Sequence, residues 1–200
     1  DTGVAALDSA LRSDLPLRGR LLGLLGSSSA LGDHLVAEPT RWASLRSELP
    51  AREDVLADML GAVGAVPEAP VEGAPPPSQA EDLRSAGTYR AAVTGGAAVN
   101  VLRSTYRDHV ALLAAHDVAS TVEDQPVLPF AEVGRRLADL ADAALTAALA
   151  VAVTTVYPDS PLPARLAVVA MGKGGARELN YISDVDVIFV SEPADAKTGR

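Results

Sequence analysis

Two aspartates stand beside an apolar run, and their spacing suits metal binding. Asp184 and Asp186 precede the run Val187 to Val190. Aspartate is depleted in strands because it is strongly hydrated and packs poorly, so a pair of them at the start of a strand needs a reason. Strand side chains alternate faces, so both carboxylates are expected to point the same way, with Cα atoms roughly 6.5 Å apart. Such a pair can share one or two divalent cations and so clamp Mg²⁺ and a nucleotide phosphate.

A glycine-rich loop lies about ten residues upstream of the aspartates. Gly172-Lys-Gly-Gly175 follows the apolar run Leu166–Met171, which predicts a buried strand, and precedes a predicted helical turn at Ala176 to Tyr181. Glycines let backbone N–H groups approach an anion, and Lys173 adds a formal positive charge. A phosphate-holding loop that faces metal-binding carboxylates indicates phosphoryl or nucleotidyl transfer. The spacing matches neither a P-loop nor a dinucleotide-binding fingerprint.

Each of these residues also has a purely structural interpretation. The two aspartates could be a solvated pair at a loop end, the glycines a tight turn, and Lys173 a surface lysine. Ser183 could cap the strand entrance or orient Asp184, and it is not interpreted as a nucleophile because no histidine stands near it in the sequence. The three histidines are scattered through predicted helices, where packed or solvated roles are expected. The glycine loop together with the aspartate pair favours the catalytic interpretation.

Composition narrows the class of protein. The 200 residues are 48% hydrophobic and only 4% aromatic, which predicts a core of Ala, Leu and Val. The formal net charge of −9 argues against binding nucleic acid through a basic surface. The absence of cysteine excludes disulfides and cysteine nucleophiles. No run of about 18 apolar residues lacks charges, and no signal peptide is visible, so neither a membrane span nor secretion is expected.

The order of elements predicts an α+β fold. Helical periodicity runs through 4–25 with a break near Pro16, starts again after a serine cap at 27–29, and returns in 52–63, 97–119 and 132–156. The proline-rich stretch 64–78 predicts a loop or linker. We therefore expect a helical region over 1–163 and the start of a nucleotidyltransferase domain over 164–200. Because the chain begins with Asp1 and ends soon after the acidic strand, it is expected to be a piece of a longer protein.

The stretch 171–190, MGKGGARELNYISDVDVIFV, resembles the signature of the glutamine synthetase adenylyltransferase family, within the polymerase β-like nucleotidyltransferase superfamily. The shared pattern is a Gly-Lys-x-Gly loop, Glu-Leu, and Ser-Asp-x-Asp before an apolar run. Gly174 is a mild departure at a position that varies in the family. The segments 28–35, 106–108 and 121–130 resemble the actinobacterial branch and its N-terminal, adenylyl-removing half.

The resemblance implies a function and a set of site residues. The family carries two nucleotidyltransferase domains: one attaches AMP from ATP to a tyrosine of glutamine synthetase, and the other removes it by phosphorolysis and releases ADP. Asp184 and Asp186 would be catalytic and bind Mg²⁺ or Mn²⁺. Gly172, Lys173, Gly174 and Gly175, with Ser183, would hold ATP, ADP or orthophosphate.

The resemblance also implies a cellular setting. Glutamine synthetase would be the protein substrate and a PII-type signalling protein a possible regulator, in the cytoplasm and in the control of nitrogen assimilation, with neither nucleic acid nor membrane as a partner. A third metal-binding carboxylate is implied on a strand beyond Arg200, so residues 1–200 alone are expected to be inactive.

Two other functions stay open from the sequence. The chain could belong to another polymerase β-like nucleotidyltransferase that modifies a small molecule or RNA, although the acidic composition disfavours RNA. It could instead be a non-catalytic regulatory or interaction module whose helices dock a partner. A carboxylate on the strands after Arg200 would favour catalysis, and a neutral residue there would favour a binding module.

Overall fold

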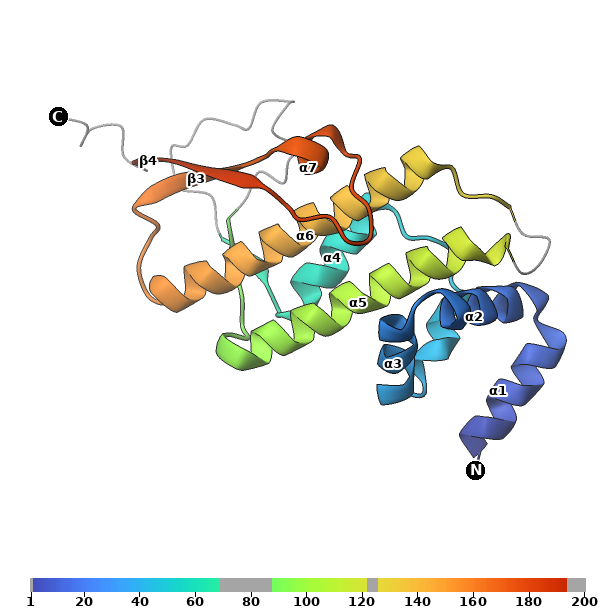
Figure 1. Cartoon of the computed structure of the whole chain (residues 1–200). Coiled ribbons are helices and arrows are strands. Elements are labelled where there is room, and N and C mark those ends of the chain that lie inside the picture. The colour runs from blue at the N-terminus through green and yellow to red at the C-terminus, as the bar shows by residue number, and fades with distance from the viewer. Residues whose placement is uncertain (1, 69–87, 122–125, 194–200) are drawn as a thin grey trace.

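The computed structural model describes residues 2–68, 88–121 and 126–193 of the chain, and it shows helices followed by a β-hairpin (Figure 1). The α+β class predicted from the sequence is confirmed. The elements, in chain order, are α1 (Thr2–Ser13), α2 (Leu15–Ser27), α3 (Ser29–Ala37), a 3₁₀ helix (Arg41–Arg46), α4 (Arg52–Ala62), β1 (Val66–Pro67), β2 (Tyr89–Arg90), α5 (Gly95–Ala119), α6 (Phe130–Val156), β3 (Ala164–Ala170), α7 (Gly172–Ala176) and β4 (Val187–Pro193).

Side-chain caps start the second and third helices. The Asp14 carboxylate accepts a hydrogen bond from the Leu17 N–H at 3.0 Å, and the Ser28 hydroxyl accepts one from the Leu31 N–H at 3.3 Å. Each bond satisfies a backbone donor that has no partner within its helix. The serine cap predicted within 27–29 is therefore confirmed at Ser28.

Helix α5 packs against the N-terminal helices through small residues. Ala111, Ala114 and Ala115 of α5 share a buried cluster with leucines of α2, including Leu17 and Leu24. Alanine lets the two helix backbones come close without large side chains between them, as the low aromatic content predicted. The buried Arg20 lies beside this cluster and donates to the backbone carbonyl of Leu45 at 2.9 Å.

Helices α4, α5 and α6 form the central layer, and their shared core is again built from small side chains. Ala98 of α5 lies with Ala143, Ala147 and Ala150 of α6 and with Met59 of α4. The helices predicted over 97–119 and 132–156 are confirmed, each beginning two residues earlier than expected. In Figure 1 the hairpin and α7 lie on the side of α6 that faces away from α1–α3.

Helix α6 is long and apolar enough to cross a membrane when judged by length and composition alone. Half of its most apolar window is buried inside the molecule, however, and its side chains contribute to two buried clusters. We therefore interpret α6 as the core helix of the fold, whose apolar composition reflects contact with other helices.

One of two short paired strands lies where the sequence predicted a loop or linker. Val66–Pro67 falls inside the stretch 64–78 but pairs antiparallel with Tyr89–Arg90. The pair is anchored by Arg90, whose guanidinium contacts the Glu68 carboxylate at 2.8 Å and the carbonyl of Ser160 at 2.7 Å. These partners are distant in sequence, so no local pattern signals the pairing. The rest of the proline-rich stretch lies outside the described residues.

The hairpin of β3 and β4 is a regular antiparallel ladder that runs from the pair Ala164–Pro193 to the pair Ala170–Val187. The buried strand predicted at Leu166–Met171 is thus a strand, but its side chains are mostly exposed. Leu166 and Val169 on β3 are more than 40% exposed, and Phe189 on β4 is 62% exposed. The prediction of a strand from the continuous apolar run is therefore confirmed, and the prediction that this strand is buried is wrong within the described structure.

Stability is expected to fall as the pH drops from 7.5 to 5.5, because burial lowers the pKa of His116 below its ordinary value of 6.5. Arg20 and Arg136 lower this pKa further, while the Ser47 carbonyl, which accepts from Nε2 at 3.0 Å, and Glu48 oppose the shift. Below pH 6.5 the unfolded chain takes up a proton that the folded chain resists, and this favours unfolding. Thermal melting followed by circular dichroism should show the decrease.

His116→Gln is the matched variant for this test. Glutamine can still donate to the Ser47 carbonyl but does not titrate, so its melting temperature should depend less on pH between 7.5 and 5.5 than that of the parent. An equal dependence in parent and variant would show that His116 does not contribute to the acid sensitivity.

Candidate active site

The glycine-rich stretch forms a single helical turn directly after β3. Helix α7 spans Gly172–Ala176, and Arg177 ends it with a left-handed backbone (φ 60°). The helical turn predicted at Ala176 to Tyr181 therefore lies on the glycines instead, and residues 178–186 are irregular. The Gly175 N–H donates to the Met171 carbonyl at 3.0 Å, so this amide is already engaged within the turn.

Gly175 is required by the close approach of the turn to β3. A Cβ atom at this position would lie 2.5 Å from the carbonyl oxygen of Ala170, far inside van der Waals contact. At Gly174 the nearest atoms to an added Cβ are 3.8 and 3.9 Å away, which is ordinary contact. The two neighbouring glycines thus have different roles, because only Gly175 lacks space for a side chain.

The two aspartates lie on the extended segment that leads into β4, not within the strand itself. Both side chains are exposed, and neither makes an ion pair or side-chain hydrogen bond with residues 2–68, 88–121 or 126–193. Asp186 borders the glycine turn: its carbonyl accepts from the Met171 N–H at 2.8 Å, and its Oδ2 lies 3.7 Å from the place a Cβ on Gly172 would take. The fold therefore brings a free carboxylate to the first residue of the glycine turn, as the sequence predicted.

Ser183 is engaged away from the aspartates. Its hydroxyl donates to Asn180 Oδ1 at 2.8 Å and accepts from the Asn180 N–H at 3.2 Å. Asn180 Oδ1 also accepts from the Ile182 N–H at 3.1 Å. These bonds close the tight turn at 180–183, so in this structure the hydroxyl shapes the approach to Asp184 and is not directed at its carboxylate.

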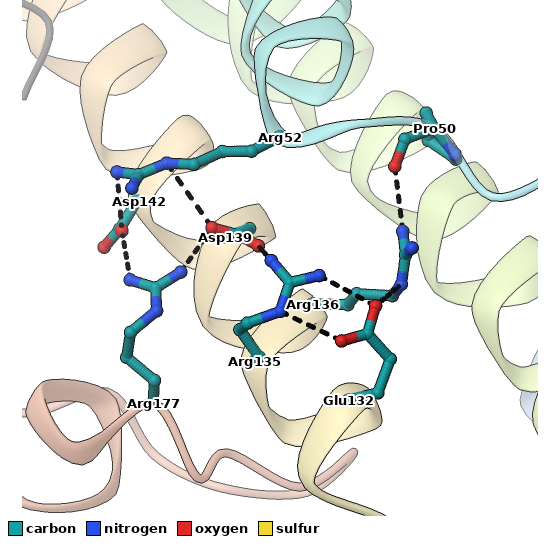
Figure 2. A network of polar contacts seen from close by, with 8 residues as sticks. All are labelled: Pro50, Arg52, Glu132, Arg135, Arg136, Asp139, Asp142 and Arg177. Carbon is teal, nitrogen blue, oxygen red and sulfur yellow. Dashed lines mark hydrogen bonds and ion pairs between the residues drawn. The ribbon is translucent and has the colours of Figure 1, made fainter. Parts of the chain in front are cut away.

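A network of charges fastens the glycine turn to the helical layer (Figure 2). Asp139 of α6 is 4% exposed, and its carboxylate contacts three arginines from three elements: Arg177 after α7, Arg135 of α6 at 2.8 Å and Arg52 of α4 at 3.4 Å. Asp142, one turn further along α6, binds Arg177 at 3.1 Å and Arg52 at 3.4 Å. A buried carboxylate needs such compensation, because its desolvation is costly.

Direct backbone packing reinforces this attachment. A Cβ on Gly134 of α6 would lie 3.2 Å from both Glu178 Cα and the Leu179 carbonyl oxygen. The Leu179 side chain is 4% exposed and is buried with Leu137 and other apolar residues of α6. Residues 177–179 therefore rest on α6 through ion pairs, an apolar anchor and a close backbone contact.

The donor set suits a hard divalent cation, although it is not a complete ligand shell. Asp184 and Asp186 are exposed and have no partner among the described residues, and carboxylates are the oxygen ligands that Mg²⁺ and Mn²⁺ prefer. Within the described parts of the chain, no group of three or more His, Asp or Glu side chains is placed to hold a metal ion. The third carboxylate implied on a strand beyond Arg200 stays a prediction.

An acidic pair beside a glycine turn is the arrangement that the resemblance to nucleotidyltransferases led us to expect, and Asp186 borders Gly172 in this way. The model of the family described as "Glutamate-ammonia ligase adenylyltransferase" matches residues 61–200. The chain belongs to this family, which confirms the resemblance seen in the glycine and aspartate motif.

Relatives from actinobacteria are similar over nearly the whole chain. A protein of Nocardia farcinica is 60% identical over 195 residues, which cover 97% of this chain and 18% of the relative. Proteins of Corynebacterium efficiens and Mycobacterium tuberculosis are 52% and 50% identical, over 97% and 100% of this chain and 20% and 18% of their own lengths. All three are named "Bifunctional glutamine synthetase adenylyltransferase/adenylyl-removing enzyme". The chain thus spans about a fifth of the length of these relatives. No solved structure matches it.

Asp139→Asn should destabilise the fold by about 3 kcal/mol, because it leaves Arg52, Arg135 and Arg177 without their shared buried charge. Asp142→Asn is the matched control: this carboxylate is 37% exposed, and its loss should cost about 1 kcal/mol or less. Urea unfolding of the two variants and the parent measures both values. Equal losses in the two variants would contradict a special role for the buried carboxylate.

Gly175→Ala should displace the turn from β3, because the added methyl group would lie 2.5 Å from the Ala170 carbonyl oxygen. We expect a loss of about 1–3 kcal/mol, as for other overpacked sites, together with altered amide shifts in 170–177. Gly174→Ala, which has space for its Cβ, should cost less than 1 kcal/mol. An unchanged spectrum and stability in Gly175→Ala would refute the close contact.

Proposed function

We propose that this chain is part of the adenylyl-removing half of a bifunctional enzyme that controls glutamine synthetase. In the proposed reaction an oxygen of orthophosphate attacks the phosphorus of AMP esterified to a tyrosine. The bond from phosphorus to the tyrosine oxygen breaks, ADP leaves, and the tyrosine oxygen takes up a proton. The observation that carries the proposal is the free Asp186 carboxylate held against the first residue of the glycine turn.

The residues present fit a divalent metal. Asp184 and Asp186 would hold Mg²⁺ or Mn²⁺, and a bound cation would offset the repulsion between two phosphate groups and stabilise the charge that develops on them. The side chains themselves would bind and orient the metal and the phosphate groups. The two carboxylates are exposed to solvent at the end of the hairpin, and Lys173, also exposed, brings a positive charge to the glycine turn. No protein nucleophile or histidine base is needed for an attack by a phosphate anion.

The choice of the removing half rests on the segments 28–35, 106–108 and 121–130, which resemble that half of the family. The relatives' names include both activities, so either half is compatible with them. We further propose glutamine synthetase as the protein substrate, a PII-type protein as regulator, ATP or ADP as nucleotide, the cytoplasm as location and the regulation of nitrogen assimilation as role.

The test uses the longer family protein that contains these 200 residues, incubated with adenylylated glutamine synthetase, orthophosphate and Mg²⁺. ADP should be released, and Asp186→Asn should slow its release by about 100-fold or more, because a charge that stabilises the transition state is lost. Asp159→Asn, an exposed aspartate in the 157–163 loop, is the matched control and should leave the rate unchanged.

Two results would overturn the proposal. In the first, the protein transfers AMP from ATP to glutamine synthetase but releases no ADP from the adenylylated form, and Asp186→Asn abolishes the transfer. This result would assign the chain to the attaching half. Neither activity from a folded protein that contains a third carboxylate on the following strands would favour a regulatory or interaction module.

A further inference from the structure

A pocket of about 240 Å³ lies between α5 and the segment that carries the aspartates. One wall is a single face of α5, formed by Arg103, Tyr106, Arg107 and Val110. The opposite wall includes Tyr181, Ser183 and Val185, and Leu137 of α6 also lines the pocket. Polar, cationic and aromatic groups thus converge on one cavity, as is usual for small-ligand sites.

Arg103 and Arg107 stand out among the described arginines. Neither makes an ion pair or a hydrogen bond with residues 2–68, 88–121 or 126–193, whereas Arg41, Arg52 and Arg177, for example, all bind carboxylates. The carboxylate next to Arg107, that of Asp108, is already taken by Arg41 and His34. The chain carries a net charge of −9, yet these two arginines, four residues apart on α5, have no carboxylate partner in the described structure.

The spacing of the two arginines suits a compact oxyanion. Residues four apart on a helix lie on the same face, with Cβ atoms about 5–6 Å apart. Two like charges at that separation repel each other, and a bound anion would relieve the repulsion. The planar donor fork of arginine matches the oxygens of a phosphate group, to which it can donate paired hydrogen bonds.

The pocket is connected to the aspartates and to the glycine turn through one residue. Val185 lines the pocket and stands between Asp184 and Asp186 in the chain. Its Cγ1 also lies 3.9 Å from the place a Cβ on Gly174 would take, so the same side chain packs against α7. A ligand in the pocket would thus contact the segment that carries the two aspartates through Val185.

The aromatic walls are held in place by the fold. The Tyr181 hydroxyl donates to Asp117 of α5 at 3.1 Å, which ties the 179–185 segment to the helix across the pocket. Burial and the Asp117 carboxylate raise the pKa of Tyr181, so the phenol stays protonated and keeps this bond. Tyr106 packs at the edge of the core shared by α4, α5 and α6.

We propose that this pocket binds the phosphate group of a substrate, with Arg103 and Arg107 as the residues that contact its oxygens. The inference rests on the proposed function, since orthophosphate and ADP are the phosphate-bearing molecules of that reaction. It adds a second binding element, on α5, to the glycine turn and the aspartate pair. Orthophosphate and the phosphate groups of ADP both present oxygens that arginine can bind, and the experiment shows which of the two molecules the pocket takes.

The test is isothermal titration calorimetry of the full 200-residue chain with orthophosphate, ADP and adenosine, in EDTA so that no divalent metal takes part. We expect ADP or orthophosphate to bind, more weakly at higher salt, and adenosine to bind at least about tenfold more weakly than ADP. Binding of both, with mutual competition, identifies a site open to either source. Binding of ADP alone identifies the nucleotide phosphates, and binding of orthophosphate alone identifies the attacking anion.

Arg103→Gln and Arg107→Gln should each weaken this binding by about tenfold or more, which is typical for the loss of a charged hydrogen-bond donor. Arg12→Gln removes the same charge from exposed α1 and should change the affinity by less than about twofold. Both α5 residues are exposed, so melting temperatures close to that of the parent will confirm that the variants fold.

The proposal is overturned if the parent binds neither phosphate compound, if both glutamine variants bind like the parent, if Arg12→Gln loses as much affinity, or if adenosine binds as tightly as ADP. The calorimetric experiment involves neither turnover nor a metal. A longer protein that fails to catalyse phosphorolysis would therefore leave the binding result standing, and a failure to bind phosphate here would leave the activity test standing.

Discussion

The buried carboxylate of Asp139 is the constraint on which the arrangement of the candidate site depends. One charge on α6 is compensated by arginines from α4, from α6 itself and from the residue that ends α7. An isolated buried carboxylate would be strongly unfavourable, so these three elements have to meet at one point. Because Arg177 is one of the three arginines, the position of the glycine turn is set by the helical layer as well as by the hairpin.

This dependence explains why a two-stranded hairpin can hold a defined site. The faces of β3 and β4 are largely exposed, with Phe189 62% and Ile188 50% accessible, and an isolated pair of strands is only marginally stable in water. The anchor at Leu179 and the close contact at Gly134 act where the hairpin's connecting segment crosses α6. The connecting segment that leads to the aspartates is therefore attached to the helical layer at Leu179 and Gly134.

Local chemistry in the sequence predicted much of the fold. The cap at Ser28, the long helices α5 and α6 and the strand after Pro163 all follow from capping, periodicity and proline preferences, which act within a few residues. The glycine loop was expected to face the aspartates because a phosphate-holding loop and metal-binding carboxylates act together, and Asp186 does border Gly172.

The long-range contacts could not be predicted in this way. Asp139 lies in an alanine-rich stripe that reads as ordinary packing, and its partner Arg52 is far away in the sequence. The helical turn predicted over 176–181 forms instead at Gly172–Ala176, although glycine has a low helix propensity, and it packs closely against β3 at Gly175. The bond between Ser183 and Asn180, by contrast, is local: the two residues are three apart, and the turn at 180–183 brings their side chains together.

Charge distribution links the scaffold to the proposed chemistry. Several arginines of this acidic chain are used in structure, where they neutralise carboxylates at helix junctions such as those of Asp108 and Asp139. The exposed Asp184 and Asp186, like the exposed Arg103 and Arg107 of α5, lack such partners in the described structure. The 179–185 segment is attached to α5 by Tyr181 and to α6 by Leu179, which fixes its position while these four charged side chains stay exposed.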